Sequence, residues 1–550
     1  MSEISGARII ARSLKQQGVE YMFGVVGFPV IPIAAVAEQE GIRYLGFRNE
    51  QSASYAAGAI GYLTGRPGAC LAVSGPGMVH GIAGLANAWS NCWPMILLGG
   101  ASDSYQDGRG AFQETPQIEA ARPFSKYAAR PESAQRIPFF VEKAVRTSIS
   151  GRPGAVFLDL PNDLIVARLD EDEVDWLPRC PEPARSLADP ECIESAIATL
   201  QSADRPLVIV GKGAAYSRAE NEVREFIEKT QLPFLASPMG KGVVPDDHPL
   251  SVAPARSHAL QNADVVFLIG ARLNWIMHFG LPPRFAEGVK IIQLDISAEE
   301  IGTNVPAAVP LVGDAQRVMS QLNRALEVKP WSYPKQTKWR GALDEQVTQN
   351  VAAVDAMLND DSEPMGYYRV LREIRDLVAR DTIICSEGAN TMDIGRTVLP
   401  NFEARHRLDA GSYGTMGVGL GFAIAAAVAH PEKKVVCVEG DSAFGFSGME
   451  VETACRFRLP ITFVIINNNG IGGGLSEYDP ANPPPFVYTI DARYEKVIEA
   501  FGGRGYLVKT IKELGPALKE ALNDPMPNVV NIMIDPAAQR KPQKFDWLTH

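Results

Sequence analysis

The sequence predicts an α/β fold made of three doubly wound parallel-sheet domains in tandem. At 550 residues the chain is too long for one hydrophobic core, and about 150 residues per domain gives three or four units. Short apolar runs alternate with longer helical stretches, a pattern typical of parallel strands covered by helices. Two breaks in composition divide this alternation into three parts.

The first domain is expected over residues 1–170, where YLGF, CLAVS, PMILLGG and AVFLDLP are candidate strands. A proline-rich, acidic stretch over 169–190 predicts a linker. The middle domain follows over 190–330, with strands expected at PLVIV, PFLAS, VVFLIG, KIIQLDI and VPLVG. An aromatic and basic connector around 331–341 leads to the third domain, 360–535, whose expected strands are TIICS, KVVCVEG, ITFVIIN and VVNIMID.

Composition excludes several classes of protein. Apolar residues at 46% and charged residues at 21% describe an ordinary globular chain, and the net charge of −11 argues against nucleic acid as the main partner. Seven irregularly spaced cysteines predict reduced thiols rather than a disulfide framework or a zinc site. Without a secretory signal, a bilayer-length apolar run or a peroxisomal ending, we expect a cytoplasmic protein with no membrane partner.

The segment GDSAFGFSGMEVETACRFRLPITFVIINNNG, residues 440–470, contains two expected strands with a helix between them. In open α/β sheets, ligands bind outside the carboxyl ends of the strands, so Asp441 and Asn468 are expected to face one crevice. A carboxylate, an amide oxygen and a backbone carbonyl, completed by phosphate oxygens, suit Mg²⁺ carrying a diphosphate. Taken alone, the same residues fit a capping aspartate and a turn-forming asparagine run.

The spacing of GDS, 24 further residues and then NN resembles the signature of thiamine diphosphate (ThDP) enzymes of the decarboxylase and acetohydroxyacid synthase type. The resemblance covers essentially the whole chain. It implies that Asp441, Asn468 and the carbonyl of Gly470 bind Mg²⁺, and that the diphosphate is held by Gly440, Ser442 and Ala443.

The segment FRNEQSASYAAGAIGYLTGRPG resembles the glutamate segment of this family, which implies a catalytic role for Glu50. Glu50 would hydrogen-bond N1′ of the aminopyrimidine ring, so that the N4′ imino group can remove the C2 proton of the thiazolium. The segment GSYGTMGVGLGFA resembles the part that bends the cofactor, with Met416 beneath it and Gly414 offering a carbonyl to N4′. The segments FGVVGFPV and SEGANTMDIGRTVL imply cofactor contacts at Val26, Gly27 and Asn390.

These residues also have purely structural explanations. Glu50 is equally a charge suited to a helix N-terminus, and Gly414 and Met416 are residues often used in packing. Because Glu50 lies in the first domain and the diphosphate residues lie in the third, the resemblance implies a homodimer or homotetramer with active sites at subunit interfaces. The linker length alone also allows a site within one chain.

Within the family, the chain resembles 2-hydroxyacyl-CoA lyases first and oxalyl-CoA decarboxylases next, through segments such as VSGPGMVHGIAGLANAWSNCWPM and SEGANTMDIGRTVL. The lyases cleave a 2-hydroxyacyl-CoA to formyl-CoA and an aldehyde or ketone, and can run in reverse as an acyloin condensation. GAFQETPQ favours the lyase, because the decarboxylase pattern has a Tyr-Glu pair at Gln113 and Glu114. Gln113 would bind the substrate hydroxyl and Glu114 would relay a proton, whereas the alternative is a solvent-exposed polar loop.

The C-terminal residues 536–550 resemble the lyase tail, which implies a lid in which Arg540, Lys541 and Lys544 contact CoA phosphates. Exposed basic tail residues are the alternative. One departure stands out: Gly472 and the two glycines after it lie where the relatives carry a tyrosine. We expect this loss to leave a wider or more mobile pocket.

The middle domain resembles a nucleotide site that holds ADP or the ADP portion of CoA in the relatives. The residues concerned are Arg152, Lys212, Arg272, Asp295 and Asp314. Glycine-rich strand ends are weak evidence by themselves. Two other functions stay open on the sequence: an oxalyl-CoA decarboxylase, and a non-catalytic nucleotide-binding member of the fold.

Overall fold

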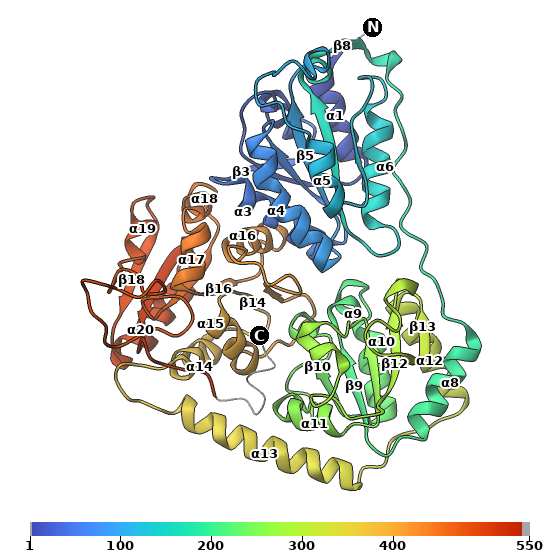
Figure 1. Cartoon of the computed structure of the whole chain (residues 1–550), viewed down its shortest axis with the longest axis vertical. Helices are drawn as coiled ribbons and strands as arrows, with labels where there is room; N and C mark the ends of the chain where they lie inside the picture. Colours follow the sequence, from blue (N-terminus) through green and yellow to red (C-terminus); the bar gives the residue numbers. More distant parts are fainter. Residues whose placement is uncertain (1–2, 542–550) are drawn as a thin grey trace.

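The computed structural model describes residues 3–541, which form three lobes (Figure 1). Each lobe contains one parallel sheet with helices on both faces, so the predicted fold class is confirmed. A separate antiparallel pair joins the two ends of the first domain and consists of β1 (Glu3–Ser5) and β8 (Arg168–Asp170).

The first sheet has the strand order β3-β2-β4-β5-β7-β6. Its strands are β2 (Tyr21–Gly24), β3 (Arg43–Gly46), β4 (Gly68–Ala72), β5 (Met95–Ala101), β6 (Ala128–Ala129) and β7 (Ala155–Pro161). Its helices are α1 (Gly6–Gln16), α2 (Ile31–Ala37), α3 (Glu50–Thr64), α4 (Pro76–Asn91), α5 (Gln117–Ala121), α6 (Ile137–Ile149) and α7 (Asn162–Val166). The near-continuous burial of β4, β5 and β7 is the pattern of central parallel strands.

The third domain repeats this topology with the order β15-β14-β16-β17-β19-β18. Its strands are β14 (Ile383–Ser386), β15 (Arg407–Asp409), β16 (Val435–Gly440), β17 (Ile461–Asn467), β18 (Arg504–Val508) and β19 (Asn528–Met533). Its helices are α14 (Tyr367–Leu377), α15 (Ala389–Val398), α16 (Gly419–Ala429), α17 (Asp441–Ser447), α18 (Glu450–Arg456), α19 (Glu495–Glu499) and α20 (Ile511–Asn523). In both sheets, the strand that is second in sequence lies at one edge, beside the first. The strand that is fifth in sequence lies at the other edge, beside the sixth.

The middle domain is a five-stranded sheet of order β10-β9-β11-β12-β13. Its strands are β9 (Pro206–Val210), β10 (Phe234–Ala236), β11 (Val265–Ile269), β12 (Lys290–Asp295) and β13 (Ala307–Val312). Its helices are α8 (Pro190–Gln201), α9 (Lys212–Tyr216), α10 (Glu220–Thr230), α11 (Arg256–Asn262) and α12 (Ala315–Val328). All strand pairs of the three large sheets are parallel.

The two connectors differ in structure. Residues 174–189 carry no helix or strand, as expected of the linker. The second connector is only partly irregular, because α13 (Lys338–Leu358) begins inside it and runs along the outside of the middle and third domains (Figure 1). Its start is fixed by the side chain of Thr337, which accepts the Arg340 amide (3.1 Å), and by the Trp339 indole, which donates to the Pro206 carbonyl (3.0 Å).

Besides the short pair β1 and β8, four strands of the large sheets were not among the sequence expectations: β2, β6, β15 and β18. Three of them lie at sheet edges, where strands are short and need no continuous apolar run. The strand β15 is the clearest case, because Arg407 and Asp409 are two charged residues among its three. Asp409 pairs with Arg396 (3.1 Å) and lies 3.7 Å from Arg407, and no apolar pattern reveals such ion pairs.

The first and third domains pack directly on each other through α3 and α16. Both helices are rich in Ala and Gly, so their backbones approach closely: a Cβ at Gly421 would lie 2.7 Å from the Ser52 carbonyl oxygen. Trp93 stacks on Tyr62 (5.2 Å) and meets Phe422 of the third domain edge-on (5.5 Å). Among residues 3–541, none of the helices has the length and apolarity needed to cross a membrane.

Candidate active site

The carboxylate of Asp441 is buried at the carboxyl end of β16, with the residue only 1% exposed. Neither of its oxygens has a hydrogen-bond partner of good geometry among the described residues. Burial raises the pKa of Asp441 to about 7, although backbone amides of Ser442 and Gly470 act in the opposite direction. A buried, unpartnered carboxylate is costly, and a cation bound at this position would remove that cost.

The three asparagines after β17 have different roles. Asn467 is fully buried and donates to the side chain of Asn531 (3.2 Å), so it is structural. Asn469 has a left-handed backbone (φ 62°) and its side chain accepts the Asp491 amide (3.0 Å), which holds the turn. Of the three asparagines, Asn468 is the one whose backbone amide acts on Asp441, and its side-chain Nδ2 donates to the Gly472 carbonyl (2.8 Å).

Gly470 and Gly388 are needed for close packing at this edge. A Cβ at Gly470 would lie 2.4 Å from the Phe486 carbonyl oxygen, so a side chain there would displace the turn. Gly440 ends β16, and a Cβ added at Gly388, which has a left-handed backbone (φ 91°), would lie 3.2 Å from the Gly440 nitrogen. The oxygen donors present, one carboxylate, one amide and backbone carbonyls, fit Mg²⁺ with a diphosphate.

Other predicted cofactor residues of the third domain lie at the same sheet edge. Ala443 is buried in the first turn of α17, and the Ser442 hydroxyl lies 3.3 Å from that of Tyr488. The Asn390 side chain lies at the start of α15, and its Nδ2 donates to the Gly472 carbonyl (3.4 Å). Asn390 and Asn468 therefore share one acceptor.

The loop that carries Gly414 and Met416 is held from beneath by Glu387. Its buried carboxylate accepts the amides of Gly417 and Gly419, the latter at 2.5 Å. Burial, together with nearby Glu439, raises the pKa of Glu387 well above its usual range. Gly414 has a left-handed backbone (φ 69°) and open space around it, so its loop presents backbone rather than side chain.

Glu50 is the first residue of α3, directly after the helix cap Asn49. Its side chain is 13% exposed, and Oε2 lies 3.1 Å from Nδ1 of His80 on α4. Gly77, one turn earlier on α4, lies close to the other carboxylate oxygen: a Cβ added at Gly77 would lie 3.1 Å from Oε1. Glu50 thus occupies a half-buried position where its two oxygens have different neighbours.

The remaining first-domain candidates also lie beyond carboxyl ends of strands. Val26 is exposed after β2, and a Cβ at Gly27 would lie 2.7 Å from a methyl group of Val73. Gln113 has a left-handed backbone (φ 58°), and its carbonyl accepts the Ser74 hydroxyl (3.0 Å). These contacts hold the 102–116 loop over the edge of the sheet where Glu50 begins its helix.

The carboxylate of Glu114 turns back into its own loop. It accepts the backbone amides of Gly108, Gly110 (2.9 Å) and Ala111 (2.9 Å). These amides lower the pKa of Glu114, and the Gly108 amide has the largest effect. The geometry gives Glu114 a loop-holding contact, while its proton relay stays a prediction.

Within one chain, the contact of Glu50 and the contact of the Gly414 loop lie at different positions along α4. Glu50 contacts His80, whereas Asn87, further along α4, donates to the Thr415 hydroxyl (2.9 Å) between Gly414 and Met416. His80 and Asn87 are two helical turns apart, a rise of roughly 10 Å.

The nucleotide candidates of the middle domain form two groups. Lys212 and Arg272 line a shallow pocket at the carboxyl ends of β9 and β11, and both reach the Ser412 hydroxyl of the third domain (3.4 and 3.1 Å). Burial, followed by the charge of Arg272, lowers the pKa of Lys212 to about 7. Its ammonium also donates to the Asn91 side chain (2.6 Å).

The second group lies beyond β12. Arg152 forms ion pairs with Asp295 (3.3 Å) and Glu300 (2.9 Å). Asp314 caps α12, where its carboxylate accepts the Arg317 amide (3.2 Å), so it serves the helix itself.

The described part of the predicted lid lies on the glycine loop. Lys541 donates its backbone amide to the Tyr368 hydroxyl (3.1 Å), and Arg540 lies 3.4 Å from the Asp393 carboxylate; Lys544 lies outside the described residues. A Cβ at Gly473 would lie 2.8 Å from the Gln539 side chain, and one at Gly474 would lie 2.7 Å from two backbone oxygens. The tail therefore fills the space at these two positions, whereas a Cβ at Gly472 would have nothing within 4 Å, and the wider pocket expected there stays a prediction.

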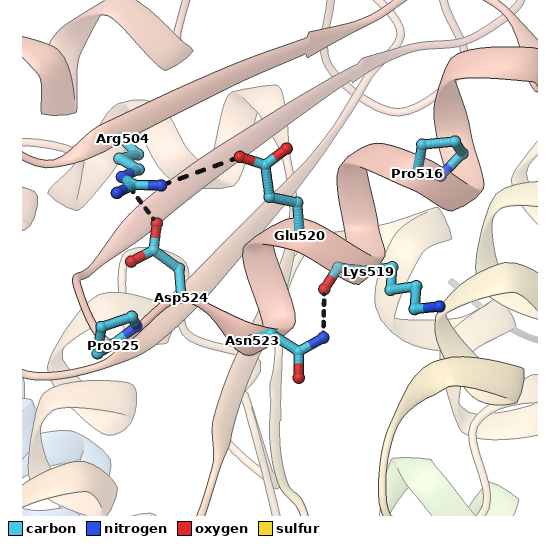
Figure 2. Close-up of a pocket in the computed structure, with 7 residues that line it drawn as sticks. All are labelled: Arg504, Pro516, Lys519, Glu520, Asn523, Asp524 and Pro525. Atoms are coloured by element: carbon cyan, nitrogen blue, oxygen red, sulfur yellow. Dashed lines mark hydrogen bonds and ion pairs between the residues drawn. The ribbon is translucent and has the colours of Figure 1, made fainter.

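A further surface hollow lies away from the candidate active site. It is lined at the amino-terminal side of β18 and β19 by Arg504, Pro516, Lys519, Glu520, Asn523, Asp524 and Pro525 (Figure 2). Figure 2 shows Arg504 between Asp524 and Glu520. The Arg504 guanidinium forms ion pairs with both carboxylates, at 3.1 Å and 3.9 Å. This end of a parallel sheet is opposite to the end where ligands bind, and the hollow is not a candidate for the cofactor.

Three family models together cover most of the chain. The models for thiamine pyrophosphate (ThDP) enzymes match residues 4–121 (N-terminal TPP binding domain), 193–322 (central domain) and 387–532 (C-terminal TPP binding domain). With two like sheets presenting Glu50 and the Asp441 set at their carboxyl ends, the chain belongs to the thiamine pyrophosphate enzyme family. The resemblance inferred from the sequence motifs is confirmed.

Curated relatives narrow the comparison. The chain is 52% identical to 2-hydroxyacyl-CoA lyase 1 of Homo sapiens over an alignment that covers 100% of this chain and 97% of the human protein. It is 46% identical to 2-hydroxyacyl-CoA lyase of Arabidopsis thaliana, with 97% and 96% of the two chains covered. It is also 44% identical to oxalyl-CoA decarboxylase of Escherichia coli (strain K12), with 97% and 95% covered.

Three residues at the site were missed by sequence reasoning: His80, Glu387 and Glu450. His80 lies in the quoted segment VSGPGMVHGIAG, four residues after the proline that begins α4, and a histidine facing a helix start was a usable signal. Glu387 and Glu450 carried no local signal, because their partners lie 30 or more residues away in sequence.

Proposed function

We propose that this protein is a ThDP- and Mg²⁺-dependent carbon–carbon lyase that splits a 2-hydroxyacyl-CoA into formyl-CoA and an aldehyde, or a ketone where C2 carries two substituents. The C1–C2 bond breaks, and its electron pair stays on the thioester carbon, which gains a proton. The 2-hydroxyl loses its proton as the new carbonyl forms. The reverse reaction is an acyloin-type condensation of the same two products.

The observation that carries this proposal is the presence of Glu50, Asp441 and Asn468 at carboxyl ends of two like sheets, in a chain similar along its whole length to curated 2-hydroxyacyl-CoA lyases. When bound, ThDP would supply the carbon nucleophile and the conjugated ring that accepts the electron pair. Asp441, Asn468 and the Gly470 carbonyl would hold Mg²⁺, while Ser442 and the backbone at Gly440 would face the diphosphate.

Glu50 would hold a proton at N1′ of the bound aminopyrimidine. Its half-buried carboxyl suits this task, because a less solvated carboxyl shares a proton more readily than an exposed one. The Gly414 carbonyl would orient the ring, and Glu387 would keep that loop in place through Gly417 and Gly419.

The substrate end is assigned to the 102–116 loop and the tail. Gln113 would bind the 2-hydroxyl or the thioester oxygen, and the tail over Gly473 would exclude water from the reacting carbons. For the CoA phosphates we propose a cluster of guanidinium groups near the Asp393 carboxylate. Arg396 (2.8 Å) and Arg540 (3.4 Å) pair with Asp393, Arg256 lies within range of its charge, and Arg284 lies within range of Arg256.

This cluster is electrostatically suited to an anion. Arg256 is buried, and burial followed by the charge of Arg284 lowers its pKa to about 10. A phosphate arriving there would relieve repulsion among like charges and would form charge-assisted hydrogen bonds. Arg540 carries the tail into the same cluster through Asp393, which would tie lid closure to CoA binding.

We also propose that ADP, or the ADP portion of CoA, binds beside Lys212 and Arg272. Both cations face the pocket at the carboxyl ends of β9 and β11, and Arg152 with Asp295 lies at the end of the adjacent strand β12. A diphosphate would stabilise the charged form of Lys212, whose environment otherwise disfavours it.

We propose further that two copies of the chain build each active site. The supporting observation is the separation along α4 between the Glu50 contact and the Gly414 loop contact. Large apolar side chains are exposed around both halves, namely Val26, Phe28, Val79 and Phe112 in the first domain and Tyr413, Phe446, Met449 and Ile471 in the third. Burying them between copies would explain why a folded chain exposes them.

A subunit-mixing experiment tests this arrangement. Glu50→Gln and Asp441→Asn variants, each inactive alone, are unfolded together and refolded, or coexpressed. If sites lie between copies, mixed dimers contain one site with both native residues, and activity returns. If mass spectrometry shows that mixed dimers have formed and activity still does not return, the whole site lies within one chain.

The reaction itself is tested by product analysis. Purified protein with ThDP and Mg²⁺ is given a 2-hydroxyacyl-CoA in one tube and oxalyl-CoA in another, and products are identified by mass spectrometry. Formyl-CoA with an aldehyde, dependent on ThDP and abolished by Glu50→Gln, is the expected result. Formyl-CoA from oxalyl-CoA alone would favour the decarboxylase, which the 44% identical relative keeps as the second candidate. Tight ThDP binding without turnover of either substrate would instead indicate a non-catalytic member.

A further inference from the structure

A carboxylate of the third domain binds the backbone that leads into Glu50. Glu450 is the first residue of α18 and is 1% exposed. Its Oε1 accepts the amides of Arg48 (3.2 Å) and Asn49 (3.1 Å), which connect β3 to α3 in the first domain. Its other oxygen accepts the Thr453 hydroxyl (2.6 Å), which fixes the orientation of the carboxylate.

These contacts sit directly before the proposed catalytic group. Asn49 caps α3 by accepting the Gln51 amide (2.7 Å), and Glu50 is the residue between them. Any movement of Arg48 and Asn49 therefore moves the Cα of Glu50 and rotates the start of its helix. His80 contacts the Glu50 carboxylate itself, so the backbone and the side chain of Glu50 are held by separate partners.

An ordinary domain contact would be expected to look different. Burying a carboxylate against peptide groups is costly, and burial raises the pKa of Glu450 to about 7. An apolar residue at this position would join the two domains at lower cost. What the carboxylate adds is direction, because two converging amides and one hydroxyl define its position.

We propose that Glu450 is a positioning residue for Glu50, acting through the amides of Arg48 and Asn49. The inference rests on the catalytic role proposed for Glu50. Glu450 does not touch cofactor or substrate; it sets where the Glu50 carboxyl meets the aminopyrimidine ring. Misplacement of a catalytic group by about 1 Å costs on the order of 100-fold in rate.

The test uses three variants of the full-length protein. Glu450→Ala removes the acceptor, and Glu450→Gln keeps an oxygen for the two amides while removing the charge. Glu452→Gln is the control on the same helix, because the Glu452 carboxylate pairs with Arg456 (3.0 Å), whereas the Arg48 and Asn49 amides donate to Glu450; Arg456 itself donates to the Gly46 carbonyl (2.7 Å). Thr453→Val, which removes the donor that orients the carboxylate, serves if Glu450→Ala fails to fold.

The first readout needs no cofactor. Amide hydrogen exchange over the peptide spanning the start of α3 should be faster in Glu450→Ala and close to wild type in Glu450→Gln and Glu452→Gln. The second is exchange of the ThDP C2 proton at saturating ThDP and Mg²⁺, measured by NMR after acid quench. It should fall about 100-fold in Glu450→Ala with little change in the ThDP dissociation constant.

A double variant separates positioning from general damage. In a Glu50→Gln background, Glu450→Ala should lower C2-proton exchange no further, because it acts only through Glu50. If Glu450→Ala lowered C2-proton exchange as much in the Glu50→Gln background as in the wild type, the inference would be overturned. Wild-type values for both readouts in the single Glu450→Ala variant would overturn it too. If Glu50→Gln alone left C2-proton exchange intact, the proposed function of Glu50 would fail first, and that result is distinguishable from the others.

Discussion

Nδ1 of His80 lies 3.1 Å from Oε2 of Glu50, across the interface between α4 and α3. The Glu50 side chain is largely buried, whereas that of His80 is 58% exposed in the single chain and is free to reorient. With Nδ1 protonated, His80 donates a hydrogen bond to the carboxylate oxygen on the side away from Gly77. This contact holds the second oxygen of the Glu50 carboxylate in a defined direction.

His80→Phe should lower kcat by about 10-fold to 100-fold, because a hydrogen bond to a charged group is worth about 1.5–3 kcal/mol. His80→Asn keeps a donor in a similar position and should recover part of the loss. Exchange of the ThDP C2 proton is the deciding measurement: it should fall in His80→Phe and be partly restored in His80→Asn. Wild-type exchange in both variants would mean that the histidine is only a neighbour.

Asp441→Asn should stabilise the cofactor-free protein and abolish its response to cofactor. Removing a buried carboxylate that lacks partners should stabilise the fold by roughly 1–2 kcal/mol. ThDP with Mg²⁺ should raise the apparent Tm of the wild type but not of the variant, because binding to the native state alone is stabilising. Asp381→Asn, which removes an exposed carboxylate paired with Lys433, is the charge-matched control. A variant stabilised by ThDP and Mg²⁺ as strongly as the wild type would contradict the metal assignment.

The lowered pKa of Lys212 predicts that the affinity for ADP depends on pH. Its pKa is lowered to about 7 in the free protein, and a bound diphosphate should raise that pKa towards the ordinary value. Affinity should therefore be highest below pH 7, where Lys212 is already charged, and should fall as the pH rises through 7 and above. At pH 8 binding should take up a proton, which calorimetry in buffers of different ionisation enthalpy measures directly.

Lys212→Met is the control for that experiment, because it removes the titrating group and leaves Arg272 in place. The variant should bind ADP more weakly and with no proton uptake at pH 8. Proton uptake that persists in the variant would assign the effect to another group, and ADP binding that does not vary between pH 7 and 9 would contradict the proposed site.

Gly474→Ala should loosen the C-terminal tail. An added Cβ would lie 2.7 Å from the backbone oxygens of Asn468 and Pro536, and backbone atoms cannot rotate away as a side chain would. Overpacking of this kind costs about 1–3 kcal/mol locally, so tail cleavage by a protease should accelerate. Gly341→Ala, on the exposed face of α13 with nothing within 4 Å, should leave the tail unaffected. Equal protease resistance in both variants would show that the tail does not depend on the glycine loop.

The metal site is the part of the molecule that local sequence patterns predict best. Asp441 and Asn468 end two buried strands that are neighbours in both sequence and space, so the spacing between them already places them at one sheet edge. The sequence predicted the position of the three asparagines but not their individual roles. Those roles depend on a partner at Asn531 and on the turn after β17. Edge strands such as β15 were missed because ion pairs, rather than apolar periodicity, accompany their burial.

The sequence alone determined the fold class, the strand-end residues and the family, because periodicity, glycine spacing and motif length are local properties. Tertiary structure alone decided which groups surround them. Asn49 and Glu450 are 401 residues apart, and they meet only because small residues let α3 and α16 pack closely. His80 and Glu50 meet because two helices of one domain converge at the same end. Polar contacts of this kind are set by the relative placement of whole elements, and no local pattern encodes that placement.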